Sequence, residues 1–205
     1  MKSTSDNTKE SLIAAGIQLF AKNGFDGVSV KEIAAQAGVN VSLVSYHFDG
    51  KEGLYRSCLA QFGRERLAVV EKLLQPPSTA EELRIKLGVF VDEVLTKHAE
   101  QPDVCQLIHN EAEKQDPIIQ DIFEQTFLKA FDTFVTFFKV AQQKKLIKAE
   151  CKPIFCAAAL YGMIFQFGKN SHISERHYGI SIKEPKGRKA VADEILRIFL
   201  DGVLI

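Results

Sequence analysis

The chain has 205 residues, of which 46% are hydrophobic and 25% charged, the composition of a folded globular protein rather than a disordered one. Because 26 Lys and Arg side chains balance 26 Asp and Glu, no overall basic excess favours nucleic-acid binding. The N-terminal residues contain no apolar stretch typical of a signal peptide, and the longest apolar run, residues 154–165, is shorter than the roughly 18 residues that a membrane span needs. We therefore expect a cytoplasmic protein with no membrane partner.

Hydrophobic periodicity and helix-stop signals predict helices along the whole chain, so the predicted fold class is all-α. We expect the helices at residues 12–20, 29–38, 40–48, 51–74, 79–97, 102–115, 117–145, 153–169 and 188–204. The two prolines within Gln75–Ser78 mark the clearest break in the first half. A polar loop that contains His172 and His177 is expected before the last helix.

The most informative segment is residues 29–48. Ser29 and Glu32 have capping-box spacing, which predicts the start of a helix. Gly38 lies in a four-residue turn that needs a positive φ, and Asn40 is the expected N-cap of the next helix. Two helices joined by such a turn are typical of a helix-turn-helix, although an ordinary pair of packed helices fits this segment equally well.

The side chains of the third helix favour the helix-turn-helix interpretation. At about 100° per residue, Val44 and Phe48 share one face, whereas Ser42 and Tyr46 point the opposite way. A helix buried in a bundle would not turn hydroxyl groups outward beside a protruding Leu43. A recognition helix would, because hydroxyls bond base edges or phosphates and apolar groups meet thymine methyls.

The first 60 or so residues resemble the DNA-binding domain of the TetR/AcrR family of transcriptional regulators. The resemblance lies within residues 14–55, in Val28-Ser29-Val30-Lys31-Glu32-Ile33-Ala34, Ala37-Gly38-Val39 and Tyr46-His47-Phe48-Asp49-Gly50-Lys51-Glu52-Gly53-Leu54-Tyr55. It implies an N-terminal three-helix helix-turn-helix domain at residues 1–50. It also implies a C-terminal helical ligand-binding and dimerisation domain at residues 51–205, with residues 51–74 as the connecting helix.

The resemblance further implies which side chains meet DNA. In such regulators the third helix enters the major groove, its first residues read base edges, and later aromatic and lysine side chains contact phosphates. The implied DNA-binding residues are Ser29, Val41, Ser42, Leu43, Ser45, Tyr46, His47 and Lys51. Ser45 stands where the family commonly has an aromatic residue, which weakens the phosphate contact expected there. Because this helix is poor in Arg, Asn and Gln, we expect modest direct readout, with DNA shape supplying part of the specificity.

Aromatic residues are concentrated in the second half of the chain. Six phenylalanines fall within residues 123–138, and four of them repeat at helical spacing. Core packing explains any one of them, but together they also suit an apolar pocket. The hypothesised effector-binding residues are His109, Phe127, Phe131, Phe134, Tyr161 and Phe165. The effector expected there is a small apolar or aromatic molecule.

The last two predicted helices carry features of a dimer interface. Small residues on the first allow another helix to approach closely, and the second is apolar over more than half its circumference. The proposed interface residues are Ala158, Gly162, Ile195 and Phe199. The alternative is a terminal helix packed into its own domain.

The sequence therefore predicts a homodimeric regulator that binds double-stranded operator DNA, a repressor released by its effector. The alternative is a helical small-molecule-binding protein, or an enzyme, without DNA binding. We predict no catalytic residues, metal or cofactor, because no Glu-x-x-His, His-Glu-x-x-His, phosphate-binding glycine loop or Gly-x-Ser-x-Gly is present. The spacing of Cys151 and Cys156 matches no metal-ligand pattern either.

Overall fold

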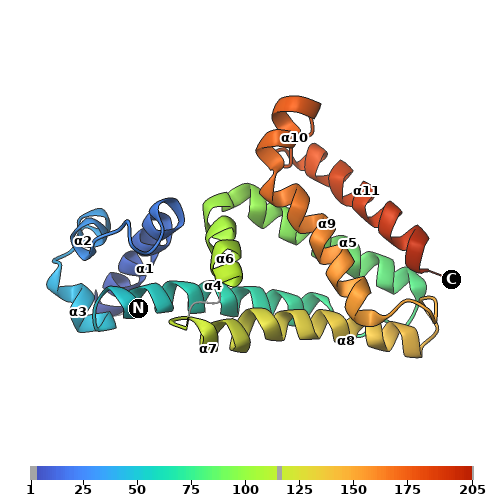
Figure 1. The fold of residues 1–205 in the computed structure, drawn as a ribbon, viewed down its shortest axis with the longest axis horizontal. Coiled ribbons are helices and arrows are strands. Elements are labelled where there is room, and N and C mark those ends of the chain that lie inside the picture. Colours follow the sequence, from blue (N-terminus) through green and yellow to red (C-terminus); the bar gives the residue numbers. More distant parts are fainter. Residues whose placement is uncertain (1–3, 115–116, 205) are drawn as a thin grey trace. The chain divides into compact units, whose positions relative to one another are not determined.

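The structure is a computed structural model that describes residues 4–114 and 117–204. These residues are almost entirely helical, so the prediction of an all-α fold is confirmed (Figure 1). The helices are α1 (Thr4–Asn23), α2 (Val30–Ala37), α3 (Ser42–Phe48), α4 (Lys51–Leu73), α5 (Ala80–Glu100), α6 (Pro102–Lys114), α7 (Gln120–Phe123), the π-helical turn η1 (Glu124–Leu128), α8 (Lys129–Gln143), α9 (Pro153–Lys169), α10 (Ser171–Tyr178) and α11 (Pro185–Val203). Within the described ranges, the β structure is limited to an isolated bridge between Ile147 and Leu204.

Most predicted helices are present with displaced ends, but two expectations are wrong. The single helix expected at residues 117–145 is interrupted: Pro117 lies in a turn, and the chain passes through α7 and η1 before α8 begins. The loop expected around His172 and His177 is the helix α10. Residue 115, at the end of the helix expected at 102–115, lies outside the described residues.

The chain divides into two compact units, and α4 runs from one into the other. The first unit contains α1, α2, α3, the part of α4 up to Arg66, and residues 103–127. The second contains residues 67–102 and 128–204 of the described chain. Each unit has a hydrophobic core of its own.

The core of the first unit joins the N-terminal helices to a later segment of the chain. Side chains of α1, α2, α3 and the start of α4 contribute to it, including Phe20, Ile33 and Val44. Leu107, Ile119 and Ile122 are buried in the same core, although they come from residues 103–127.

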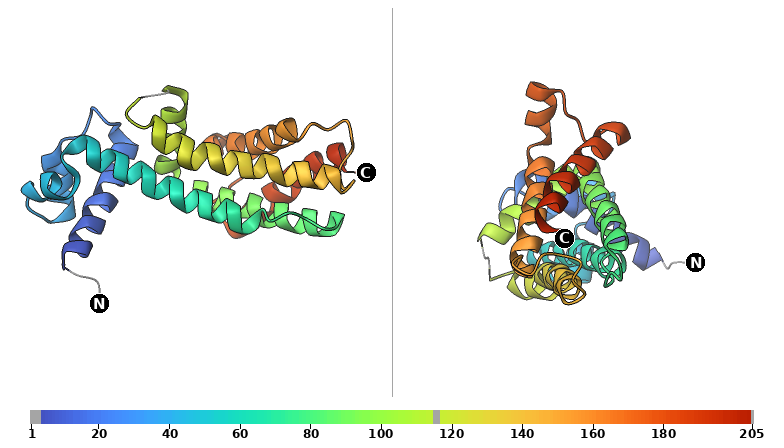
Figure 2. Two further views of the ribbon diagram at one scale, coloured as in Figure 1. Left: turned by 90° about the horizontal axis from the view of Figure 1, so that it is seen from below. Right: turned by 90° about the vertical axis from the view of Figure 1, so that its right-hand side faces the viewer.

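The core of the second unit lies among α5, α8, α9 and α11, which pack on one another (Figure 2). Phe134, Phe137 and Phe138 of α8 are buried there together with Ile195 and Phe199 of α11. α10 packs on α9 and does not contribute a buried side chain.

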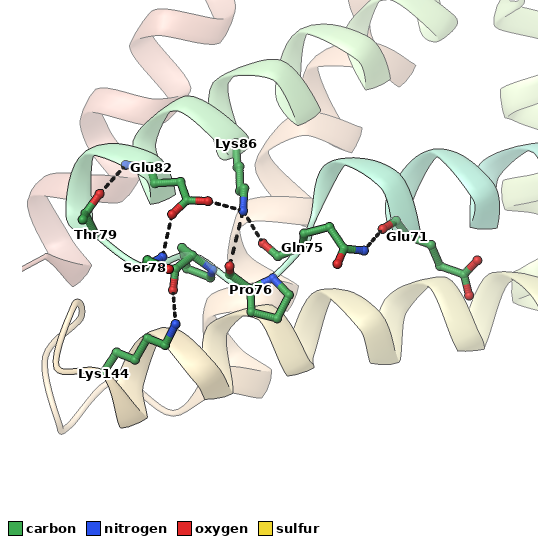
Figure 3. A network of polar contacts seen from close by, with 9 residues as sticks. Glu71, Gln75, Pro76, Ser78, Thr79, Glu82, Lys86 and Lys144 are labelled. Atoms are coloured by element: carbon green, nitrogen blue, oxygen red, sulfur yellow. Dashed lines mark hydrogen bonds and ion pairs between the residues drawn. The ribbon is translucent and has the colours of Figure 1, made fainter.

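A polar network fixes the turn between α4 and α5 within the second unit (Figure 3). The Thr79 hydroxyl accepts a bond from the Glu82 amide at 3.1 Å, and the Glu82 carboxylate accepts one from the Ser78 amide at 2.7 Å. Lys86 pairs with Glu82 and donates to the backbone carbonyl of Gln75. The hydrogen bond from Lys86 lowers the pKa of Glu82 the most, and the bond from the Ser78 amide lowers it further. The break predicted at Gln75–Ser78 is therefore an ordered turn.

Candidate nucleic-acid interface and effector site

The start of α2 is held by the predicted capping box, which the structure confirms. The Ser29 hydroxyl accepts a bond from the Glu32 amide at 3.2 Å, and the Glu32 carboxylate accepts one from the Ser29 amide at 2.7 Å. The Ser29 hydroxyl also donates to that carboxylate at 2.7 Å. The bonds from the Ser29 hydroxyl and amide lower the pKa of Glu32, with a smaller contribution from the nearby charge of Lys51.

Removing this cap is expected to destabilise α2. We expect Ser29→Ala to lower the free energy of unfolding by about 1 kcal/mol, the usual contribution of an N-cap hydroxyl.

Since the pKa of Glu32 is lowered by folding, the stabilising contribution of its carboxylate is present above its ordinary pKa of 4.5 and is lost as the pH falls through the lowered value. Urea unfolding of the wild type and Glu32→Gln at pH 7 and below pH about 3 checks the sign. A stability difference that is larger at the acidic pH would contradict it.

The turn between α2 and α3 has the geometry that the sequence predicts. Gly38 adopts a φ of 69° and closes the C-terminus of α2, with its amide bonded to the Ala35 carbonyl. At the start of α3, the Asn40 side chain accepts bonds from the amide and the hydroxyl of Ser42 at 2.9 and 2.8 Å. Val41 occupies the N-cap position, so the expectation that Asn40 is the N-cap is wrong by one residue. The side chain that accepts a bond from the first turn is nevertheless that of Asn40.

The faces of α3 are divided into a buried and an exposed side. Val44 and Phe48 are buried in the core of the first unit, as the periodicity predicts. The exposed side consists of Val41, Ser42, Ser45 and Tyr46. Tyr46 is 78% exposed, and its ring lies edge-on to His47, with centroids 4.9 Å apart. The helix thus presents hydroxyl and aromatic groups to solvent from a rigid base.

Three of the remaining members of the DNA-binding set are less exposed, whereas Ser29 is exposed. Leu43 and His47 are half-buried, and Leu43 packs against the core. Lys51, at the first position of α4, is also half-buried, and its ammonium lies 4.4 Å from the centroid of the Phe25 ring. This cation–π contact holds the Lys51 charge close to the body of the first unit.

The six residues of the hypothesised effector site come from both units. His109 and Phe127 belong to the first unit, and the other four to the second. Phe134 is buried in the second core, 4.9 Å from the Phe90 ring centroid, so it is a packing residue. Phe127 stacks on Phe62 and Phe123.

Three of the six form a continuous aromatic row within the second unit. The ring centroids of Phe131 and Tyr161 lie 6.3 Å apart, and those of Tyr161 and Phe165 lie 6.0 Å apart. Phe165 meets the buried His98 at 5.6 Å. A Cβ on Gly168 would overlap with the His98 imidazole, so this glycine lets α9 approach α5. Sequence reasoning missed His98, a single histidine with no motif around it.

The four residues assigned to a dimer interface lie in two environments. Ala158 and Gly162 are exposed on α9, in line with the exposed ring of Phe155. Ile195 and Phe199 are buried in the core of their own unit, and α11 instead exposes Ile198.

No group of three or more His, Cys, Asp or Glu side chains in residues 4–114 and 117–204 could hold a metal ion. None of the helices in those ranges is long and apolar enough to span a membrane.

Burial, with a smaller contribution from Cys151, raises the pKa of Cys156 to about 11, and burial raises that of Cys58 to about 12. Both thiols are therefore weakly reactive.

Comparison with known proteins agrees with this geometry. A family model described as "Bacterial regulatory proteins, tetR family" matches residues 12–58. YttP of Bacillus subtilis (strain 168), named a probable HTH-type transcriptional regulator, is 28% identical over 60% of this chain and 59% of its own length. The HTH-type transcriptional repressor BepR of Brucella suis biovar 1 is 23% identical over 81% of each chain. The match to YttP thus spans about three fifths of that relative.

Solved structures share the fold along nearly the whole chain. FadR from Bacillus subtilis, in complex with stearoyl-CoA, has a TM-score of 0.74 at 16% identity and covers 94% of this chain and 98% of its own. SmeT of Stenotrophomonas maltophilia, in complex with triclosan, has a TM-score of 0.70 at 15% identity and covers 97% and 92%. At such identities the likeness shows the fold, whereas the likeness in sequence lies in the match at residues 12–58 and in the named relatives. With a capped helix-turn-helix at its N-terminus and a helical second unit, this chain is similar to the TetR/AcrR family of transcriptional regulators.

Proposed function

We propose that the protein is a repressor that binds operator DNA as a homodimer through α3 and is released by a small apolar or aromatic effector. The observation that carries the proposal is the exposed side of α3, made of Val41, Ser42, Ser45 and Tyr46, on a helix whose other side is fixed in the core. A rigid helix with outward hydroxyls and an aromatic group suits the major groove.

The bonding of Ser42 refines how this helix would read DNA. Its hydroxyl already donates to Asn40, so towards a base it can act only as an acceptor. The partners left for it are the amino groups of adenine or cytosine. Val41 would meet a thymine methyl, while Tyr46 and His47 would contact phosphates. Ser29 has no donor left for a phosphate, because its hydroxyl and its amide both donate to Glu32. Specificity would otherwise come from DNA shape.

Few cations are placed to meet phosphate, which limits the electrostatic part of binding. Residues 1–60 contain six Lys and Arg and six Asp and Glu. Three of those cations are engaged, Lys9 with the Phe48 ring, Lys51 with the Phe25 ring and Arg56 with Asp121. Hydroxyls and helix N-termini would then supply much of the phosphate contact.

The salt dependence of operator binding is accordingly expected to be shallow. With about three cations per protomer left to meet phosphates, the slope of log affinity against log salt for a dimer should be about −5, at roughly −0.9 per phosphate neutralised by a cation. Titration of a bound DNA fragment at four or more salt concentrations measures the slope. A value of about −8 or steeper would show that more cations reach the backbone than we propose.

For the dimer, the exposed stripe of α9 supports an interface built on Phe155, Ala158 and Gly162, with Ile198 of α11 beside it. Small residues let a symmetry-related helix approach closely, and the phenylalanine would be covered in the dimer. Ile195 and Phe199 would then support the interface from inside their own unit. Binding of both protomers to successive major grooves requires recognition helices about 34 Å apart.

For the effector, the aromatic row of Phe131, Tyr161 and Phe165 supports a ligand with a large apolar or aromatic part. The ligands of the two similar structures, stearoyl-CoA in FadR and triclosan in SmeT, have such parts. An effector that binds more tightly to a dimer with another helix spacing would lower operator affinity by its differential affinity for the two states.

Selection of genomic fragments by the purified protein tests the function. We expect a few discrete fragments, each with a two-fold related site, and release of the DNA by hydrophobic compounds such as triclosan. A small-molecule-binding protein or an enzyme would retain no discrete fragment. Transcription from a retained fragment, measured with and without the protein, distinguishes repression from activation.

A further inference from the structure

One stretch from the middle of the chain is part of the unit that carries the helix-turn-helix. Leu107, Ile119 and Ile122 are buried in the core that also contains Val44 and Phe48 of α3. The stretch, residues 103–127, continues directly into helices of the second unit: α5 ends at residue 100 and α8 begins at residue 129. A rearrangement of either helix therefore acts on this stretch through the chain itself.

An ion pair connects this stretch to α4. Nη1 and Nη2 of Arg56 donate to the two carboxylate oxygens of Asp121 at 2.9 and 2.7 Å, and Nη1 also donates to the Ile118 carbonyl. The bidentate bond raises the pKa of Arg56 and lowers that of Asp121. Such fork-to-fork pairs fix an orientation as well as a distance.

Arg56 stands on a part of α4 that is rigidly connected to α3. Only two residues separate the end of α3 from the start of α4 at Lys51. The side chains around Arg56 that are buried in the common core are Leu54, Tyr55, Cys58 and Leu59. A displacement of residues 118–121 is therefore transmitted by Arg56 to the base of the recognition helix.

A second contact lies seven residues further along the same face of α4. A Cβ on Gly63 would overlap with the Thr126 side chain, so α4 and η1 touch directly. The Thr126 hydroxyl in η1 donates to the Ile122 carbonyl in α7 at 2.6 Å. Two attachments on one face of α4 determine how the stretch lies along that helix.

We propose that Arg56 is a positioning residue for DNA binding, which through Asp121 holds residues 118–121 on α4 and keeps α3 in its operator-binding orientation. This inference rests on the proposed function. Arg56 and Asp121 are 34% and 52% exposed, and exposed pairs contribute little to the free energy of unfolding. The buried core holds the fold, so the pair is free to select among arrangements of similar stability.

The test compares variants whose charge effects and positioning effects have opposite signs. Asp121→Arg makes the first unit more positive, which by electrostatics alone would strengthen DNA binding. Loss of the pair predicts weaker binding instead, by about tenfold, the usual size of a coupling between sites. The matched control is Glu124→Arg, an identical charge change at an exposed position three residues away. It should bind a selected genomic fragment as tightly as the wild type or more tightly.

The double variant Arg56→Asp with Asp121→Arg re-forms the ion pair with its charges exchanged. It should therefore restore binding to within about threefold of the wild type. Arg56→Asp alone should weaken binding more than Arg64→Asp, at an exposed position on the same helix. Thermal unfolding of every variant should stay close to that of the wild type. If Asp121→Arg does not fold, Asp121→Asn replaces it, with the same expected direction.

Equal binding by Asp121→Arg and Glu124→Arg, or a swapped pair no better than the single variants, would overturn the role of Arg56. Those results would leave the proposed function standing. If the wild-type protein retained no genomic fragment, the proposed function would fail, and the positioning role with it.

Discussion

Phe138→Ala is expected to lower the free energy of unfolding by about 3–5 kcal/mol, the cost of removing a buried phenylalanine and leaving a cavity. Phe138 is 0% exposed, and its ring centroid lies 5.2 Å from that of Phe134, 5.5 Å from that of Phe137 and 5.7 Å from that of Phe199. Since domains of this size are stable by only about 5–15 kcal/mol, the variant should unfold at a much lower urea concentration.

The matched control is Phe155→Ala, because Phe155 is 66% exposed on α9. Measured as a monomer at high dilution, its unfolding midpoint should shift by far less than that of Phe138→Ala. Equal shifts for both variants would mean that the aromatic cluster of α8 does not form the core of the second unit.

Tyr46→Ala is expected to weaken binding by about tenfold on every DNA sequence, since a phosphate contact carries no sequence information. Lys51→Ala should have a smaller effect in the same direction, because the Phe25 ring already holds the Lys51 ammonium. Ser42→Ala or Leu43→Ala should instead change the preference among sequences, most clearly at one position of each half-site. Affinities for a selected fragment and for single-base variants of it separate the two patterns.

Tyr178→Ala is the matched control for Tyr46→Ala, because Tyr178 is 76% exposed on α10 of the second unit. It should bind DNA as the wild type does. If Tyr46→Ala changed the preferred sequence and Ser42→Ala weakened all sequences alike, our orientation of α3 in the groove would be wrong.

Local chemistry explains which parts of the fold were predictable. The capping box of Ser29 and Glu32 and the turn at Gly38 depend on residues within a few positions of each other, so sequence spacing reveals them. The turn at Gln75–Ser78 is marked by two prolines for the same reason. These features place α2, α3 and α4, and with them the exposed side of α3.

The misplaced elements depend on contacts that spacing does not show. α10 is polar on all sides, and it is held instead by Glu175, which accepts bonds from Ser181 and Lys183, and by Gly179 at a φ of 68°. η1 depends on Thr126 packing against Gly63, more than 60 positions earlier in the chain.

The candidate sites show the same limit. α11 is apolar over more than half its circumference, but periodicity does not tell which of its apolar side chains face the helix's own core. Ile195 and Phe199 face that core, whereas Ile198 is exposed. Likewise, the phenylalanine repeat of α8 does not separate Phe134, which is buried, from Phe131, which joins the aromatic row. The pair of Arg56 and Asp121 spans 65 positions and has no signature in the sequence.

The late contribution of residues 103–127 to the first core has a consequence for biosynthesis and engineering. Synthesis proceeds from the N-terminus, so the helix-turn-helix leaves the ribosome before Leu107, Ile119 and Ile122 exist, and its core stays incomplete until they follow. A gene fragment that ends at Arg66 would encode the same incomplete core. The DNA-binding region is therefore not a cassette that can be excised, and its specificity is better transplanted by grafting the exposed side chains of α3.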